Sequence, residues 1–208
     1  MENNKKREKQ PIIVTYTYSK AIHNVAIIGT IGRDTLLTKT QYDDITANAT
    51  YLIEDCFGLK LGRNGNIHLV SGGAAWVDHV AVRLYLEKKV ASLTLHLPCE
   101  WDTDLCKFRE YGGGGGRGVS VNIHHKIMSA ACGIDSLAEI GEVMKHKNVN
   151  VYIWDGFHQR NDKVATADYM IAYTKGETYP PRGSNAKYTW DRFKHKESRR
   201  IHIRLIAI

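Results

Sequence analysis

The chain alternates between short apolar runs and longer segments in which apolar residues recur every three or four positions. The apolar runs have the length of strands and occupy residues 24–29, 67–70, 92–97, 148–154, 169–174 and 201–206. Buried parallel strands have such continuous apolar sequences, and each parallel connection needs a crossover that is usually a helix. The alternation therefore predicts an α/β protein, a Rossmann-like three-layer sandwich in which helices flank a mainly parallel sheet.

Helical periodicity marks the segments between these runs. The clearest are residues 42–57, with Thr40 as the expected N-cap, and residues 136–145, capped by Asp135 or Ser136. Further helices are expected from Ala74 onward, over residues 122–131 and 162–167, and around residues 188–193.

The stretch Ser71-Gly72-Gly73 stands between an apolar run and an expected helix. Glycines let the backbone approach a ligand closely, and the free N–H groups of a helix N-terminus favour an anion. The stretch therefore predicts a turn that holds a phosphate or another anion.

Polar residues follow several of the expected strands, and residues 155–161 form a concentrated polar patch of this kind. Ligands of open parallel sheets bind outside the carboxyl ends of the strands. The loops at residues 29–33 and 71–73, the strand end at Thr174 and the turn at residues 183–185 are therefore expected to converge on one crevice.

Composition limits the size of the fold and the kind of partner. The 208 residues suffice for one α/β domain, expected over residues 21–208, with a peripheral arm over 1–20 and a glycine-rich loop over 111–118. The net charge of +7, from 29 basic and 22 acidic residues, favours an anionic partner, although a solvated surface explains the same excess.

No apolar run is long enough to cross a bilayer, and the N-terminal residues lack the apolar core of a secretory signal. The four cysteines form no CxxC pair, which fits reduced thiols in an intracellular protein. We therefore expect a soluble, cytoplasmic protein with no membrane partner. Because Cys99, Cys106, His124 and His125 lack the spacing of zinc ligands, no metal site is expected.

Four segments carry a resemblance to a known superfamily: VAIIGTIGR, VSGGAAWVDHVA, GFHQRNDKVATADYMIAYT and RGSNAKYTW. In this order they resemble the SLOG superfamily of Rossmann-like nucleotide-binding domains, which includes the DNA-processing protein A family and the Lonely Guy phosphoribohydrolases. The resemblance spans roughly residues 22–206. Trp76 departs from the DNA-processing pattern, in which a glycine is common.

The resemblance implies a nucleotide or nucleotide-sugar ligand, no other cofactor, and a homodimer paired through helices. Ser71, Gly72 and Gly73 would hold a phosphate, Asp78 would lie near the sugar or fix the turn, and Arg160 and Asn161 would contact a phosphate, ribose or strand backbone. The other expected ligand-binding residues are Gly29, Thr30, Arg33, Trp76, Phe157, Thr174, Gly183, Ser184 and Asn185.

Three functions remain open at this point. The first is binding of a nucleotide without turnover. The second is cleavage of a nucleotide N-glycosidic bond, with Asp78 as the catalytic carboxylate, although RGSNAKYTWD lacks the glutamate of the Lonely Guy motif PGGxGTxxE. The third is binding of single-stranded nucleic acid through the basic chain ends and Arg160.

Overall fold

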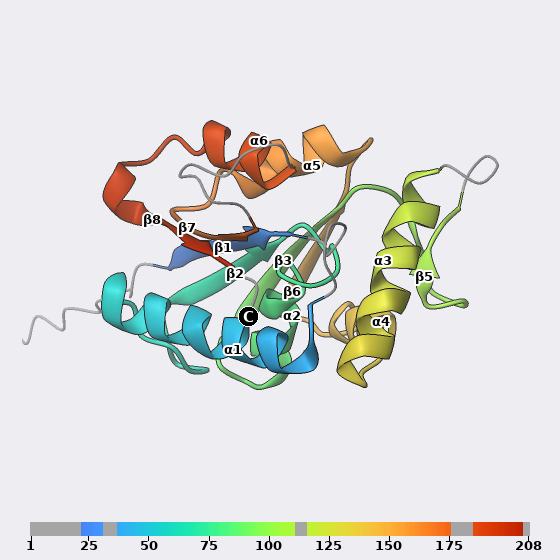
Figure 1. Cartoon of the computed structure of the whole chain (residues 1–208), viewed down its shortest axis with the longest axis horizontal. Coiled ribbons are helices and arrows are strands. Elements are labelled where there is room, and N and C mark those ends of the chain that lie inside the picture. The colour runs from blue at the N-terminus through green and yellow to red at the C-terminus, as the bar shows by residue number, and fades with distance from the viewer. Residues whose placement is uncertain (1–21, 31–36, 111–115, 176–184, 206–208) are drawn as a thin grey trace, which may run out of the picture.

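A six-stranded parallel sheet forms the centre of the molecule, with strand order β6-β3-β2-β1-β7-β8 and helices on both faces (Figure 1). The computed structural model describes residues 22–30, 37–110, 116–175 and 185–205. This arrangement is the Rossmann-like three-layer α/β sandwich that the sequence predicts. The parallel strands are β1 (His23–Gly29), β2 (Ile67–Ser71), β3 (Ser92–Leu97), β6 (Val149–Ile153), β7 (Tyr169–Thr174) and β8 (Arg200–Arg204).

The helices divide between the two faces of the sheet. In Figure 1, α1 and α2 cover one face and α5 and α6 cover the other, while α3 and α4 pack together beside a small hairpin, β4–β5. Their bounds are α1 (Lys39–Tyr51), α2 (Val80–Leu86), α3 (Arg117–Cys132), α4 (Ser136–Val143), α5 (Phe157–Val164) and α6 (Asn185–Arg192). The shorter elements are a π-helix (Leu52–Cys56), a 3-10 helix (Glu197–Arg199), β4 (Trp101–Asp102) and β5 (Lys107–Phe108).

Each face of the sheet has its own hydrophobic core, as strand β1 illustrates. Val25 and Ile27 belong to the larger core under α1 and α2, whereas Ala26 and Ile28 belong to the core under α5 and α6. Side chains of a strand alternate between the two faces, so a strand that is buried on both sides has a continuous apolar sequence. No helix among the described residues is long and apolar enough to span a membrane.

Several helix starts differ from the sequence expectations. Helix α1 is capped by Thr38 and not by Thr40, because Thr38 forms a reciprocal capping box with Gln41. Helix α5 begins at Phe157, so the polar patch that follows β6 is largely helical. Asp135 caps α4 as expected. The peripheral arm over residues 1–20 and most of the glycine-rich segment lie outside the described residues.

The strand order reverses its direction at β1, because β2 lies on one side of it and β7 on the other. At this switch point β1 and β7 approach closely: a Cβ atom on Gly29 would lie 2.1 Å from the carbonyl oxygen of Tyr173. Only glycine fits there. The carboxyl ends of β1 and β7 therefore border the place where doubly wound sheets bind ligands.

Candidate functional site

Two small hollows adjoin each other at the carboxyl ends of β1 and β2, and both are lined by Ala74, Arg160 and Asn185. The first hollow is also lined by Ile28, Gly29, Asp78, Asn161, Val164, Ala186 and Thr189. The second hollow is also lined by Ala75, Ser120, Val121, His124 and Phe157. Each has a volume of about 20 Å³, which is room for about one water molecule.

A buried ion pair between Asp78 and Arg160 forms the centre of the site. Arg160 Nη1 donates to Asp78 Oδ2 over 2.8 Å, and the two side chains are only 6% and 7% exposed. Burial raises the pKa of the Asp78 carboxyl, while the Arg160 guanidinium and the backbone N–H groups of Gly29 and Ala74 counteract that rise. The carboxylate is thus fully engaged by donors of the fold itself.

The Ser71-Gly72-Gly73 turn differs from the expected phosphate-binding turn. The helix that follows begins only at Val80, so its N-terminal N–H groups do not adjoin the glycines, and this expectation was wrong. The Ser71 hydroxyl donates to the Asp78 carbonyl oxygen and accepts from the Gly73 N–H, which fixes the turn internally. The anion that the turn surrounds is the side chain of Asp78.

Gly72 is required by the position of Arg160. A Cβ atom at Gly72 would lie 1.5 Å from Arg160 Nη1 and 2.7 Å from Asp78 Oδ2. Such overlap would force the guanidinium away from its carboxylate. The second glycine, Gly73, adopts a φ of +65°, a conformation that side-chain-bearing residues rarely adopt.

Two buried hydrogen-bond donors of the first hollow have no partner within the described part of the chain. They are Nε of Arg160 and Nδ2 of Asn161, in residues that are 5% and 2% exposed. Unsatisfied buried donors are rare and costly, and they call for an explanation such as a bound water, ion or ligand. The first hollow is therefore lined by two residues that each have a donor left over for a hydrogen-bond acceptor.

The second hollow has a different chemical character. The Phe157 ring borders it, with the Arg160 guanidinium 5.8 Å from the ring centroid, and Val121 and Ala75 add apolar surface. Ser120 and His124 bring helix α3 to the same place. A flat or apolar group beside Phe157 would thus lie next to an oxygen bound in the first hollow.

Helix α3 supports the glycine turn from behind through a buried histidine. His125 is fully buried, and its Nε2 lies 3.1 Å from the carbonyl oxygen of Gly73, while its Nδ1 lies 3.0 Å from Ser136 Oγ. Burial and the neighbouring His79 lower the pKa of His125 to about 3. The neutral ring therefore donates to Gly73 through Nε2, with Nδ1 accepting from Ser136.

Several expected site residues lie elsewhere. Trp76 was expected to bind the ligand, but it is fully buried in the larger core and lines neither hollow. Ser71 is fully buried, and the Thr174 hydroxyl pairs with His202 Nε2 at 2.7 Å. Neither residue lines a hollow, nor does Thr30. Arg33, Gly183 and Ser184 lie outside the described residues.

Three further acidic residues, Glu54, Glu100 and Asp191, line neither hollow. Asp191 pairs with Lys187, Glu100 pairs with Arg109, and Glu54 is exposed on the π-helix. No group of three or more His, Cys, Asp or Glu side chains among the described residues is placed to hold a metal ion.

The sequence expectations missed Ala74, Ala186, Thr189 and the α3 residues Ser120 and His124. Helix α3 has no strand of the main sheet directly before it, so its contact with the crevice has no signal in the strand pattern. Small residues such as Ala74 become visible as site residues only when the packing is known.

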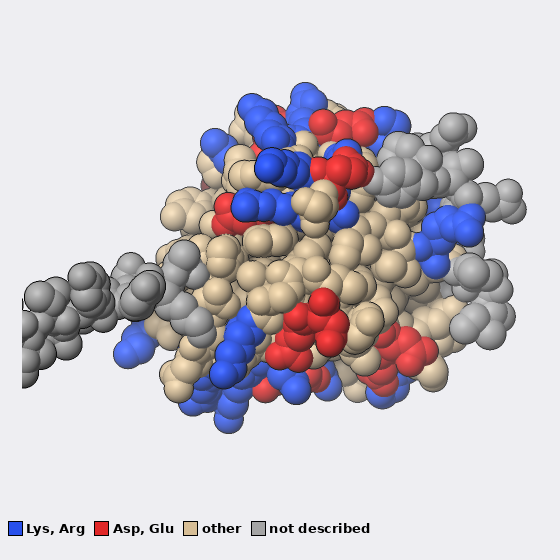
Figure 2. All heavy atoms as spheres, turned by 90° about the vertical axis from the view of Figure 1, so that its left-hand side faces the viewer, with Lys and Arg blue, Asp and Glu red and all other residues tan. Residues whose placement is uncertain are grey.

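The basic C-terminal region does not form a surface of one charge. Arg192 pairs with Asp162, and Arg200 pairs with Glu197. On the side of the molecule in Figure 2, Lys and Arg are interspersed with Asp and Glu above and below a largely uncharged band. Surfaces that bind nucleic-acid backbones are enriched in positive charge along a continuous track.

The fold and the site define the chain as a Rossmann-like α/β protein with a polar crevice at the switch point of its parallel sheet. It is 35% identical over 184 residues to "Uncharacterized protein R261" of Acanthamoeba polyphaga mimivirus, covering 86% of this chain and 95% of the viral protein. The chain belongs to the family of that viral protein. No family model matches it, and no solved structure matches it.

Proposed function

We propose that the protein binds a nucleotide or a nucleotide derivative over the crevice at the carboxyl ends of the strands, where each of the two hollows has room for one small group of the ligand. The observation that carries the proposal is the pair of unpartnered buried donors, Arg160 Nε and Asn161 Nδ2, at the switch point of the sheet. Phosphate and ribose oxygens accept such hydrogen bonds, and the Phe157 ring beside them suits a base. The resemblance of four segments to SLOG nucleotide-binding domains favours the same ligand class.

Binding without turnover accounts best for the state of Asp78. Cleavage of an N-glycosidic bond needs a carboxylate that can reach the sugar, and a proton donor for the base. The Asp78 carboxylate is buried and engaged by Arg160 and two backbone N–H groups. We therefore assign Asp78 the role of orienting Arg160, with the ligand contacts made by Arg160 and Asn161.

Native mass spectrometry of freshly purified full-length protein tests the proposal. We expect a co-purified nucleotide-sized mass, or binding of at least one member of a nucleotide panel in calorimetric titration, without release of free base on incubation. Release of free base would support the glycosidase instead. No co-purified ligand and no binding of any nucleotide would refute the proposal.

A substitution in the second hollow tests how the ligand lies. Phe157→Ala is expected to weaken binding of the nucleotide but to leave binding of the corresponding ribose phosphate unchanged, because only the base would contact the ring. Equal weakening of both ligands would contradict this orientation.

A further inference from the structure

A pocket of about 500 Å³ lies at the amino ends of the strands, at the opposite end of the sheet from the crevice. Its walls are formed by the turn before β2, which carries Arg63, by the end of α2 and the turn before β3, which carry Tyr85 and Lys88, and by the segment before β6, which carries His146 and Lys147. The volume lies within the range of small-molecule sites, roughly 300–1,000 Å³.

Hydrogen bonds tie the walls of this pocket together. The Gly62 N–H donates to the Lys89 carbonyl oxygen at 2.5 Å, and the Leu93 N–H donates to the Asn148 carbonyl oxygen at 3.2 Å. The Asn148 side chain donates to the Ala91 carbonyl oxygen at 3.4 Å. The three turns thus have a fixed arrangement, so the pocket is part of the fold.

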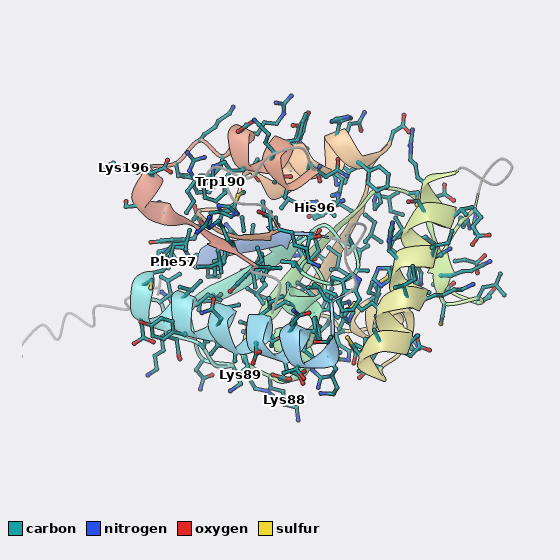
Figure 3. The ribbon with its side chains drawn as sticks, viewed as in Figure 1. Phe57, Lys88, Lys89, His96, Trp190 and Lys196 are labelled. Atoms are coloured by element: carbon teal, nitrogen blue, oxygen red, sulfur yellow. The ribbon has the colours of Figure 1, made fainter. Side chains whose placement is uncertain are left out.

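The pocket carries an excess of positive charge. Arg63, Lys88 and Lys147 form no ion pair within the part of the chain that the structure describes, and Glu142 is the acidic residue among the lining side chains. The C-terminal ends of α2 and α4 each add roughly half a negative charge. The three positive charges of Arg63, Lys88 and Lys147 together exceed the negative charges of Glu142 and of the two helix ends. Figure 3 shows Lys88 beside Lys89 at the edge of the molecule, where both residues are exposed.

The pocket also has an aromatic and apolar wall. The Tyr85 and His146 rings lie with centroids 5.7 Å apart, and the Tyr85 hydroxyl is 3.2 Å from His146 Nδ1. Leu86 and Val90 contribute apolar surface beside them. From the volume, the charge and this wall we infer that the pocket is a second binding site, which takes a small phosphorylated molecule with an aromatic body.

Phenyl phosphate is a suitable probe, because it combines a ring and a phosphate and is not a nucleotide. In calorimetric titration of the full-length protein we expect it to bind more tightly than inorganic phosphate. The double variant Lys88→Glu/Lys147→Glu should weaken phenyl phosphate at least tenfold. The double variant Lys126→Glu/Lys194→Glu makes the same change of charge at exposed positions outside the pocket and should leave the affinity unchanged.

Two results would overturn the inference. The first is an equal loss of affinity in both double variants, which would indicate non-specific charge attraction. The second is absence of phenyl phosphate binding; if the Lys88/Lys147 variant then loses binding of a single-stranded oligonucleotide, the surface binds nucleic acid instead. Asn161→Leu should not alter phenyl phosphate binding at this pocket. Failure of the pocket hypothesis can therefore be distinguished from failure of nucleotide binding in the crevice.

Discussion

Replacement of Asn161 by leucine separates the role of this residue in binding from its role in stability. Asn161 Nδ2 is a buried donor without a partner within the described residues, and leaving such a group unsatisfied costs about 1–3 kcal/mol. Leucine has a similar volume and no donor. The free energy of unfolding should therefore stay the same or rise by up to about 2 kcal/mol, while nucleotide affinity falls by about tenfold or more because a hydrogen bond to the ligand is lost.

Asn122→Leu is the matched control, since Asn122 is equally buried but fully bonded. Its Oδ1 accepts from the Phe108 N–H at 3.0 Å, and its Nδ2 donates to the Phe108 carbonyl oxygen at 2.8 Å and to Glu110 Oε1 at 2.9 Å. This variant should lose roughly 2–5 kcal/mol of stability, because two backbone groups become unsatisfied.

Urea unfolding followed by tryptophan fluorescence gives the stability of both variants, and calorimetric titration gives the affinity. A loss of stability in Asn161→Leu as large as that in Asn122→Leu would refute the reasoning. It would show that Asn161 has a structural partner, so the hollow would need no ligand.

Three further perturbations test the surrounding packing and charge. Gly72→Ala should destabilise the protein by roughly 3 kcal/mol in urea unfolding, because the new Cβ atom displaces Arg160 from Asp78; a wild-type midpoint would contradict this. Asp78→Asn should lower the free energy of unfolding by about 3–5 kcal/mol, since it leaves a buried guanidinium without a counter-charge. Replacing both Asp78 and Arg160 by apolar residues should recover much of that stability while abolishing ligand binding. Burial holds the pKa of His125 at about 3, below its ordinary 6.5, so in acid the unfolded chain binds more protons than the folded chain. The free energy of unfolding should therefore fall as the pH falls below about 6.5, by roughly 2 kcal/mol at pH 5. His125→Gln should remove that part of the pH dependence, and an unchanged slope would show that the ring is accessible to protons.

The arrangement of strands could be predicted because each parallel strand is buried on both faces. The continuous apolar runs at 24–29 and 169–174 coincide closely with β1 and β7, and the glycine at the end of β1 is required by the close approach of β7. Hairpin β4–β5 was missed, since two-residue strands have no periodicity to detect.

The helix that follows the glycine turn could not be located from sequence. Ala74 to Val77 are compatible with a helix, but Trp76 has a φ of +64°, which interrupts helical geometry, and its ring is fully buried. This burial in the larger core accompanies a non-helical turn, and α2 starts only at Val80. Tertiary packing thus outweighs the local helix propensity.

The error about that helix changes which group of the ligand the site can recognise. A helix N-terminus next to Gly73 would have offered free N–H groups to a phosphate, whereas the N–H of Gly73 is bonded to Ser71 and that of Ala74 to Asp78. Asp78 also neutralises the charge of Arg160, so the pair as a whole attracts an anion only weakly. What remains is the directional chemistry of two donors. A ligand that binds here should therefore be selected by the acceptor atoms that it offers to Arg160 Nε and Asn161 Nδ2. Its affinity should depend only weakly on salt, in contrast to the steep salt dependence of a nucleic-acid-binding surface.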